Sequence, residues 1–93
     1  MKDLSERLRW VREKAGLSTK GLDAVAGLTK GHTSAIERRE RLDPSMSTLR
    51  KLAAALGVSL DWLILGRGTA PTVTRLRASI SARLRSRLES AVS

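Results

Sequence analysis

Apolar residues recur every three or four positions along this chain, the spacing that gathers them on one face of an α-helix. Five short runs of this kind follow one another between residues 4 and 66, and the last, residues 60–65, is the most apolar. The inward positions of the first four runs are Leu4, Leu8, Val11 and Ala15; Leu22, Val25 and Ala26; Thr33 and Ile36; and Leu49, Leu52, Ala53 and Leu56. The pattern predicts a helical chain.

Residues that favour helix boundaries flank these runs. A Ser, Thr or Asp side chain before a helix accepts a hydrogen bond from its first turn, whereas Gly favours the end. The candidate starts are Asp3 or Ser5, Ser18, Thr29, Pro44 or Ser45, and Ser59. The candidate ends are Gly16, Gly27, the charged loop 38–44, Gly57 and Gly66. We therefore expect an all-α domain over residues 1–66.

A linker and a longer helix follow this domain. Residues 67–71 combine Gly and Pro, and residues 72–93 carry a narrow apolar stripe on an otherwise Ser- and Arg-rich helix that Thr72 or Thr74 can cap. The stripe consists of Val73, Leu76, Ile80, Leu84, Leu88 and Val92. Because an isolated helix of this length is only marginally stable in water, the stripe has to be buried against something.

We expect this C-terminal helix to serve self-association rather than to remain a free basic arm. Its stripe can meet the same stripe of a second chain, or an outer patch near Trp10, Trp62 and Leu65 on its own or a partner's domain. Trp10 lies roughly opposite Leu8 and Val11 on a helical wheel. Since only Glu89 balances the flanking arginines, repulsion opposes a parallel zipper, and packing onto the partner's domain is favoured. The predicted dimerisation residues are Trp10, Trp62, Leu65, Leu76, Ile80, Leu84 and Leu88.

The charge of the chain points to a polyanionic partner. Lys and Arg number 18 against 9 Asp and Glu, a net charge of +9 on 93 residues. The six arginines and one glutamate after residue 66 contribute +5 of this, which leaves +4 for residues 1–66. Nucleic acid is the first candidate and an anionic membrane the second. Phe and Tyr, which stack single-stranded bases, are absent, so duplex DNA is favoured over single-stranded RNA.

Other functional classes find little support. The absence of Cys excludes a disulfide framework and thiolate metal sites, and His32 has no second ligand at a suitable spacing, so we expect no metal and no cofactor. The chain also lacks a catalytic constellation and a phosphate-cradling Gly-rich loop, and we do not expect an enzyme. Neither a signal peptide at residues 1–6 nor a membrane span is recognisable, so a cytoplasmic location is expected.

The segment 17–38 carries the functional signal. It combines a capped short helix, a turn at Gly27 and a second short helix, as two steeply crossing helices require. Gly27 allows the left-handed backbone of a tight turn. The second helix is left with a small and polar outer face, made of Lys30, Gly31, Ser34, Ala35 and Arg38. The major groove of DNA admits an α-helix, and small residues let it lie deep.

Residues 4–66 resemble the Cro/phage-repressor helix-turn-helix family, also called the xenobiotic-response-element family. The matching residues are Leu8, Val11 and Arg12; Gly16 to Ser18; Ala26 to Thr29; Ile36 to Arg38; Pro44 and Ser45; Leu49, Leu52 and Ala53; Leu56 to Ser59; and Asp61 to Leu63 before Gly66. The resemblance implies a five-helix lambda-repressor-like DNA-binding domain, here with an added C-terminal amphipathic helix. It also implies double-stranded DNA as the partner, a homodimer on a palindromic operator, and an ion pair between Arg12 and Glu37.

The chain departs from the family pattern at four positions. Thr19 replaces the usual Gln, Asp23 stands where a small Ala is common, and Thr33 replaces a typical Ile or Val. Arg39 occupies a usual Gly position, and the loop after it is one residue longer. The contacts normally made from position 19 and the end of the third helix are thereby put in question.

The candidate DNA-binding residues are Thr19, Lys20, Thr29, Lys30, Gly31, His32, Ser34, Ala35, Arg38, Arg39 and Arg41. Lys30 is expected to reach guanine, and an Ala methyl to meet the methyl of thymine. His32, Arg38, Arg39 and Arg41 are expected to contact phosphates. For each of them a plain solvated surface residue is the alternative, and Ser18 and Thr29 are helix caps first.

Two other functions remain open. The chain could be an antitoxin-type regulator whose basic tail binds a protein toxin, which would make the C-terminal helix a protein-binding segment. It could also be a protein-interaction or membrane-surface module on a repressor-like scaffold. The absence of Trp and Phe from the apolar side of the tail argues against a membrane partner.

Overall fold

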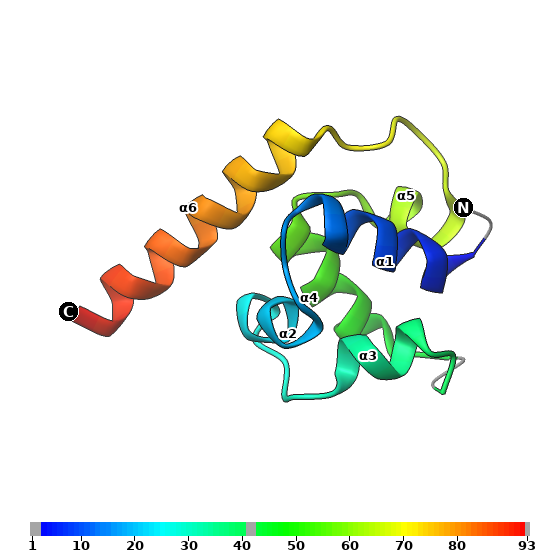
Figure 1. Cartoon of the computed structure of the whole chain (residues 1–93), viewed down its shortest axis with the longest axis horizontal. Coiled ribbons are helices and arrows are strands. Elements are labelled where there is room, and N and C mark those ends of the chain that lie inside the picture. The colour runs from blue at the N-terminus through cyan, green and yellow to red at the C-terminus, as the bar shows by residue number, and fades with distance from the viewer. Residues whose placement is uncertain (1–2, 41–42, 93) are drawn as a thin grey trace.

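The computed structural model describes residues 3–40 and 43–92, with side chains described through residue 82. The described residues form six helices and no strand: α1 (Leu4–Lys14), α2 (Thr19–Ala26), α3 (His32–Glu37), α4 (Met46–Leu56), α5 (Leu60–Leu65) and α6 (Val73–Val92). The all-α prediction is confirmed. Figure 1 shows α1 to α5 gathered in one bundle, with α6 running along one side of it and its C-terminal end standing away from the other helices.

The helix boundaries arise from local capping, largely as the sequence predicts. Four N-cap side chains each accept a hydrogen bond from a first-turn backbone N–H: Asp3 from Glu6, Ser18 from Gly21, Ser45 from Thr48, and Ser59 from Trp62. Thr72 does the same for the N–H of Arg75 at 3.2 Å. Gly27, Gly57 and Gly66 end α2, α4 and α5 in the left-handed conformation.

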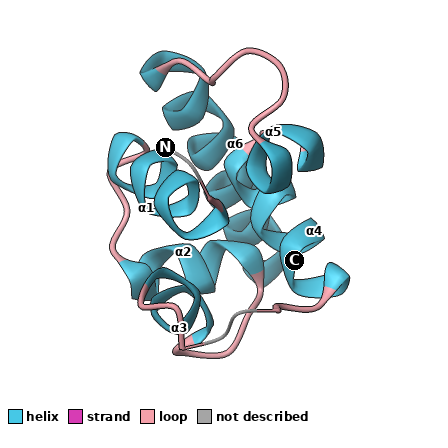
Figure 2. Cartoon of the chain, turned by 90° about the vertical axis from the view of Figure 1, so that its right-hand side faces the viewer, coloured by secondary structure: helices cyan, strands magenta, loops and turns pink. Residues whose placement is uncertain are grey.

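The core is built from the inner faces of all six helices. Its most completely buried side chains are Leu8, Leu22, Ile36, Leu52, Leu56, Leu63, Leu76, Val11 and Thr33. In the view of Figure 2, α2 and α3 lie together at the end of the bundle opposite the loop that follows α5. The apolar core thus holds α2 and α3 by their inner faces and leaves their outer faces to solvent.

A buried arginine ties α1 to the end of α5. The guanidinium of Arg7 is 5 % exposed and donates from Nε to the carbonyl oxygen of Leu63 at 2.8 Å and from Nη2 to that of Ile64. These carbonyls belong to the last turn of α5, where intrahelical donors run out. The role of Arg7 was not predicted, because nothing local in the sequence links it to a helix end 56 residues away.

The first half of α6 is part of the domain's core. Leu76 and Ile80 are 1 % and 6 % exposed, and α6 contacts α1, α2 and α4. The sequence favours burial of this stripe on a partner's domain, whereas in the structure its first half is covered by the chain's own helices. While α6 is docked in this way, Leu76 and Ile80 are not free to form a surface with a second copy. The side chains of Leu84 and Leu88 lie outside the described residues.

The two tryptophans pair with each other inside the chain. Their ring centroids are 6.0 Å apart, Trp62 is 5 % exposed, and Trp10 is half-buried against the core. Trp10 was expected to face outward as a docking surface, but α5 supplies the ring that covers it. Leu65, by contrast, is 57 % exposed. Among the described residues, no helix is long and apolar enough to cross a lipid bilayer.

Candidate nucleic-acid interface

The predicted helix-turn-helix consists of α2, a turn, and α3. Gly27 ends α2 at φ +74°, and the turn continues to Gly31, which precedes α3 at φ +101°. Both angles lie in the left-handed region that residues with a Cβ rarely adopt. The prediction that Thr29 caps α3 is wrong: the N-cap position is Gly31, which has no side chain to accept a hydrogen bond.

Asp23 on α2 supplies the missing cap. Its carboxylate accepts hydrogen bonds from the backbone N–H of Gly31 at 3.0 Å and of Thr33 at 2.9 Å, and from the Thr33 hydroxyl at 2.6 Å. Asp23 is 2 % exposed and Thr33 is fully buried. The two departures from the family pattern at positions 23 and 33 are therefore two halves of one interaction. The sequence contained both, but no local pattern connects them.

The expected base-reading residues fall at and just before the start of α3. Lys30 is exposed in the turn, one residue before the N-cap, rather than on the helix. Gly31 adopts φ +101°, a backbone conformation that by itself favours glycine at this position. Ser34 and Ala35 are half-buried on α3, and the Ser34 hydroxyl donates to the Gly31 carbonyl at 3.3 Å. The exposed Lys30 thus lies just before a helix that carries the small side chains of Ser34 and Ala35.

His32 is the first residue of α3 and is held against the preceding turn. Its Nδ1 lies 3.0 Å from the carbonyl oxygen of Thr29 and 3.2 Å from the Thr29 hydroxyl. These contacts hold the imidazole ring against the turn through Nδ1. The described residues contain no group of His, Asp and Glu that could hold a metal ion.

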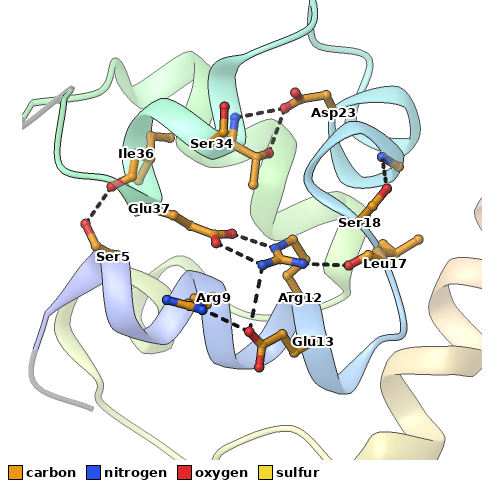
Figure 3. Close-up of polar contacts among 12 residues, drawn as sticks. Ser5, Arg9, Arg12, Glu13, Leu17, Ser18, Asp23, Ser34, Ile36 and Glu37 are labelled. Atoms are coloured by element: carbon orange, nitrogen blue, oxygen red, sulfur yellow. Dashed lines mark hydrogen bonds and ion pairs between the residues drawn. The ribbon is translucent and has the colours of Figure 1, made fainter.

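Beside the N-terminus of α2 lies a shallow depression of about 270 Å³. It is lined by Arg9, Arg12, Thr19, Ser34, Glu37 and Arg38, which come from α1, α2 and α3 and the residue after it. Figure 3 shows Arg9, Ser34 and Glu37 around this region. Arg9 was not among the predicted site residues, although its place one turn before Arg12 on the same helix could have suggested it. Three guanidinium groups against one carboxylate line the depression, and together with the N-terminus of α2 they make it suited to an anion.

The floor of this depression is an ion pair between α1 and α3. Arg12 donates from Nε to one Glu37 oxygen at 2.6 Å and from Nη2 to the other at 2.9 Å, and its Nη1 donates to the Leu17 carbonyl at 2.8 Å (Figure 3). The Arg12 and Glu37 side chains are 13 % and 8 % exposed. The hydrogen bond to Glu37 raises the pKa of Arg12. The pair fixes the end of α3 against α1 through a planar, two-point contact.

Further cations surround the helix-turn-helix. Lys20 is exposed in the first turn of α2, and Arg38, exposed after α3, lies 3.3 Å from Glu40. Arg39 adopts φ +59°, which explains why glycine is usual at this position, and its guanidinium lies 3.0 Å from Asp3. The hydrogen bonds from the Glu6 N–H and from Arg39 lower the pKa of Asp3. Arg41 lies outside the described residues.

Comparison with known sequence families identifies the family to which this helical domain belongs. The helix-turn-helix family model matches residues 8–63, a span that begins in α1 and ends in α5. This chain belongs to the Cro/C1-type helix-turn-helix family. The helix-turn-helix protein of Figure 1 thus contains the family's domain together with α6, which lies beyond the matched residues.

Three curated relatives carry regulator names. The transcriptional regulator SinR of Bacillus subtilis is 34 % identical over 61 residues, which are 66 % of this chain and 55 % of SinR. The transcriptional regulator DdrOP3 of Deinococcus deserti is 36 % identical over 63 residues, 68 % of this chain and 48 % of the relative. The transcriptional repressor RghR of Bacillus subtilis is 32 % identical over 78 residues, 84 % and 58 % respectively. The chain spans about half the length of the curated relatives it matches.

Proposed function

We propose that this chain is a sequence-specific regulator of transcription that binds double-stranded DNA and performs no catalysis. In the proposal it acts in the cytoplasm as a homodimer and represses by occupying a palindromic operator. The names of the relatives, two regulators and a repressor, support the transcriptional role. The net charge of +9 supports a polyanionic partner.

The observation that carries the proposal is the placing of α3 beside the N-terminus of α2. A short helix with small outer residues fits the major groove. Lys30, which is exposed in the turn that precedes this helix, can contact the edges of bases there. The cationic depression at Thr19 lies next to this helix and suits a backbone phosphate. A groove-reading element flanked by a phosphate anchor is the arrangement that sequence-specific binding requires.

The proposed roles divide the interface into two kinds of contact. Lys30, Ser34 and Ala35 read bases, while Gly31 sets the backbone that presents Lys30. The phosphate contacts are assigned to exposed or half-buried residues around the base readers: Arg9, Thr19, Lys20, Thr29, His32, Arg38, Arg39 and, by sequence alone, Arg41. The phosphate contacts give affinity and register, and the base contacts give specificity.

A homodimer would place two copies of α3 about one DNA turn apart, roughly 34 Å. Because Leu76 and Ile80 are covered within the chain, the docked form offers other apolar residues for the interface. Leu65 at the end of α5 and Val73 at the start of α6 are 57 % and 42 % exposed. We therefore propose that Leu65 and Val73 contribute to self-association.

The test of the groove assignment is Lys30→Ala, with Lys51→Ala on the exposed face of α4 as a charge-matched control. Lys30→Ala is expected to cost about 1–3 kcal/mol of binding to a selected duplex and to relax the preference at one base position. Lys51→Ala should leave the preference intact. Unchanged affinity and preference in Lys30→Ala would contradict the assignment.

A further inference from the structure

The cap formed by Asp23 has no counterpart in the family's usual residues at these two positions. An Ala at position 23 and an Ile or Val at position 33 would make an apolar contact between α2 and α3. In this chain the same two positions carry a carboxylate and a hydroxyl 2.6 Å apart, both buried. An apolar pair cannot accept the N–H groups of Gly31 and Thr33, whereas Asp23 accepts both.

The Asp23 carboxylate fixes the backbone conformation at the end of the turn, besides occupying a buried position. The turn from Gly27 to Gly31 contains two residues in the left-handed region, and α3 is only six residues long. A helix so short has little cooperativity of its own, so its start depends on tertiary contacts. Asp23 holds the N-cap residue and the second residue of α3 from one rigid point on α2. Lys30 is directly bonded to the pinned Gly31.

The N-termini of α2 and α3 differ in the charge of the residue that caps them. At α3, the carboxylate of Asp23 lies at the positive end of the helix dipole and accepts the N–H groups of Gly31 and Thr33. At α2, the cap is a neutral serine, and the neighbouring cations are Lys20 and two exposed arginines, Arg9 and Arg38, whose ion pairs with Glu13 and Glu40 lie at the surface. A phosphate therefore finds unoccupied helix N–H groups more readily at the start of α2 than at Gly31 and Thr33, whose N–H groups bind Asp23.

We propose that Asp23 is a specificity-positioning residue: through Thr33 and the Gly31 amide it fixes where Lys30 and α3 stand relative to the phosphate anchor on α2. Asp23 itself is buried and touches no DNA. The inference rests on the proposed function, because it deepens the account of how the same interface discriminates between sequences.

The test compares Asp23→Ala, the apolar pair Asp23→Ala with Thr33→Val, and Asp61→Ala. The double variant restores the family's apolar contact and so protects the fold if the single variant unfolds. Asp61→Ala removes an equal charge from an exposed position on α5. For each protein, the affinity for a duplex selected by the wild type is divided by the affinity for a scrambled duplex of equal length. Amide hydrogen exchange at Gly31 and Thr33 is measured without DNA.

In both Asp23 variants the affinity ratio should fall by at least about tenfold, the discrimination that one base contact supplies. The affinity for the scrambled duplex should stay within about twofold of that of Asp61→Ala, since phosphate contacts are unchanged. The Gly31 amide should exchange faster while amides of α4 remain protected.

Three results would overturn the proposal. The first is a double variant that keeps the wild-type affinity ratio, which would make Asp23 a packing residue only. The second is an exchange rate at the Gly31 amide that is the same in the Asp23 variants as in the wild type, which would show that the hydrogen bond to Asp23 does not hold the turn. The third is a wild type that prefers no duplex over its scrambled copy; this overturns the proposed function itself and the specificity role with it.

Discussion

At the residue scale, Arg12 joins three parts of the domain through one side chain. It joins α3 through Glu37 and the turn before α2 through the Leu17 carbonyl, with 13 % of its side chain exposed. The attraction within an ion pair this buried is about as large as the free energy lost when the two charges leave water. Removing one partner leaves the other charge buried without a counter-ion, which destabilises the fold.

The first prediction follows from this asymmetry. Arg12→Met should cost about 3–5 kcal/mol of unfolding free energy, because Glu37 remains buried without its cation. Arg12→Met combined with Glu37→Leu should cost much less. Urea unfolding of the two single variants and the double variant measures the coupling. Additive costs would show that the two side chains act independently.

The second prediction concerns pH and the cap of α1. Because the folded-state pKa of Asp3 is lowered below 3.8, its charge stabilises the fold above that pH, and the stabilisation is lost as the pH falls through the folded pKa. Asp3→Asn keeps a capping oxygen but has no charge. The stability advantage of the wild type over Asp3→Asn should be present at neutral pH and vanish in acid. A difference that is constant with pH would contradict this.

How far the residues could be predicted depends on what connects them. Caps such as Ser18 and Ser59 were predictable, because a cap and its helix are adjacent in the chain. The partnership of Asp23 with Thr33 and that of Arg7 with the end of α5 were not predicted, because they require two segments to meet in space. The Arg12–Glu37 pair was expected only through the family resemblance.

At the element scale, α6 approaches the end of α4 more closely than a side chain at Gly57 would allow. A Cβ at Gly57 would lie 2.9 Å from the Cβ of Ser79 and closer still to its hydroxyl. Gly27 has a similar φ of +74°, but a Cβ there would meet no atom within 4 Å. A substitution at Gly27 therefore introduces backbone strain alone, whereas the same substitution at Gly57 introduces backbone strain and a clash with α6.

The third prediction uses this pair. Gly27→Ala should cost about 1–2 kcal/mol of unfolding free energy from the left-handed backbone alone. Gly57→Ala should cost about 1–3 kcal/mol more, because α6 has to shift. In a Ser79→Gly background, the extra cost of Gly57→Ala should largely disappear. If Gly27→Ala and Gly57→Ala cost the same in the wild-type background, α6 does not dock on Gly57 in solution.

The elements were more predictable than their partners. Periodicity and capping gave all six helices, since both are local properties of the chain. The start of α3 was misplaced because Thr29 resembles a cap, whereas the actual cap comes from another helix. The burial of α6 on its own domain was left open, since a stripe of leucines does not specify which apolar surface covers it.

At the scale of the whole molecule, the docking of α6 buries apolar residues within one chain that could otherwise contact a second chain. Leu76 is 1 % exposed within one chain, whereas Val73, three residues earlier, is 42 % exposed. A stripe covered within one chain contributes to stability at any protein concentration. A stripe shared between chains contributes only where the chains associate.

The fourth prediction follows from this difference. Leu76→Ala should cost about 2–5 kcal/mol of unfolding free energy, equally at low and high protein concentration. Met46→Ala, the control at an apolar residue that is 50 % exposed on α4, should change the stability by less than about 0.5 kcal/mol at every concentration. Denaturant unfolding over a hundredfold range of concentration makes the comparison. A cost of Leu76→Ala confined to concentrations at which the wild type dimerises would place the stripe between chains.

The central claim is that this molecule reads the sequence of duplex DNA through α3, and selection from a pool of random duplexes tests it most directly. After repeated rounds with the wild-type protein, the account predicts one enriched motif with two inverted half-sites about 10 base pairs apart, centre to centre. The same selection with Lys30→Ala should give a motif degenerate at the corresponding position in each half-site. Recovery of duplexes without any common motif would contradict the account.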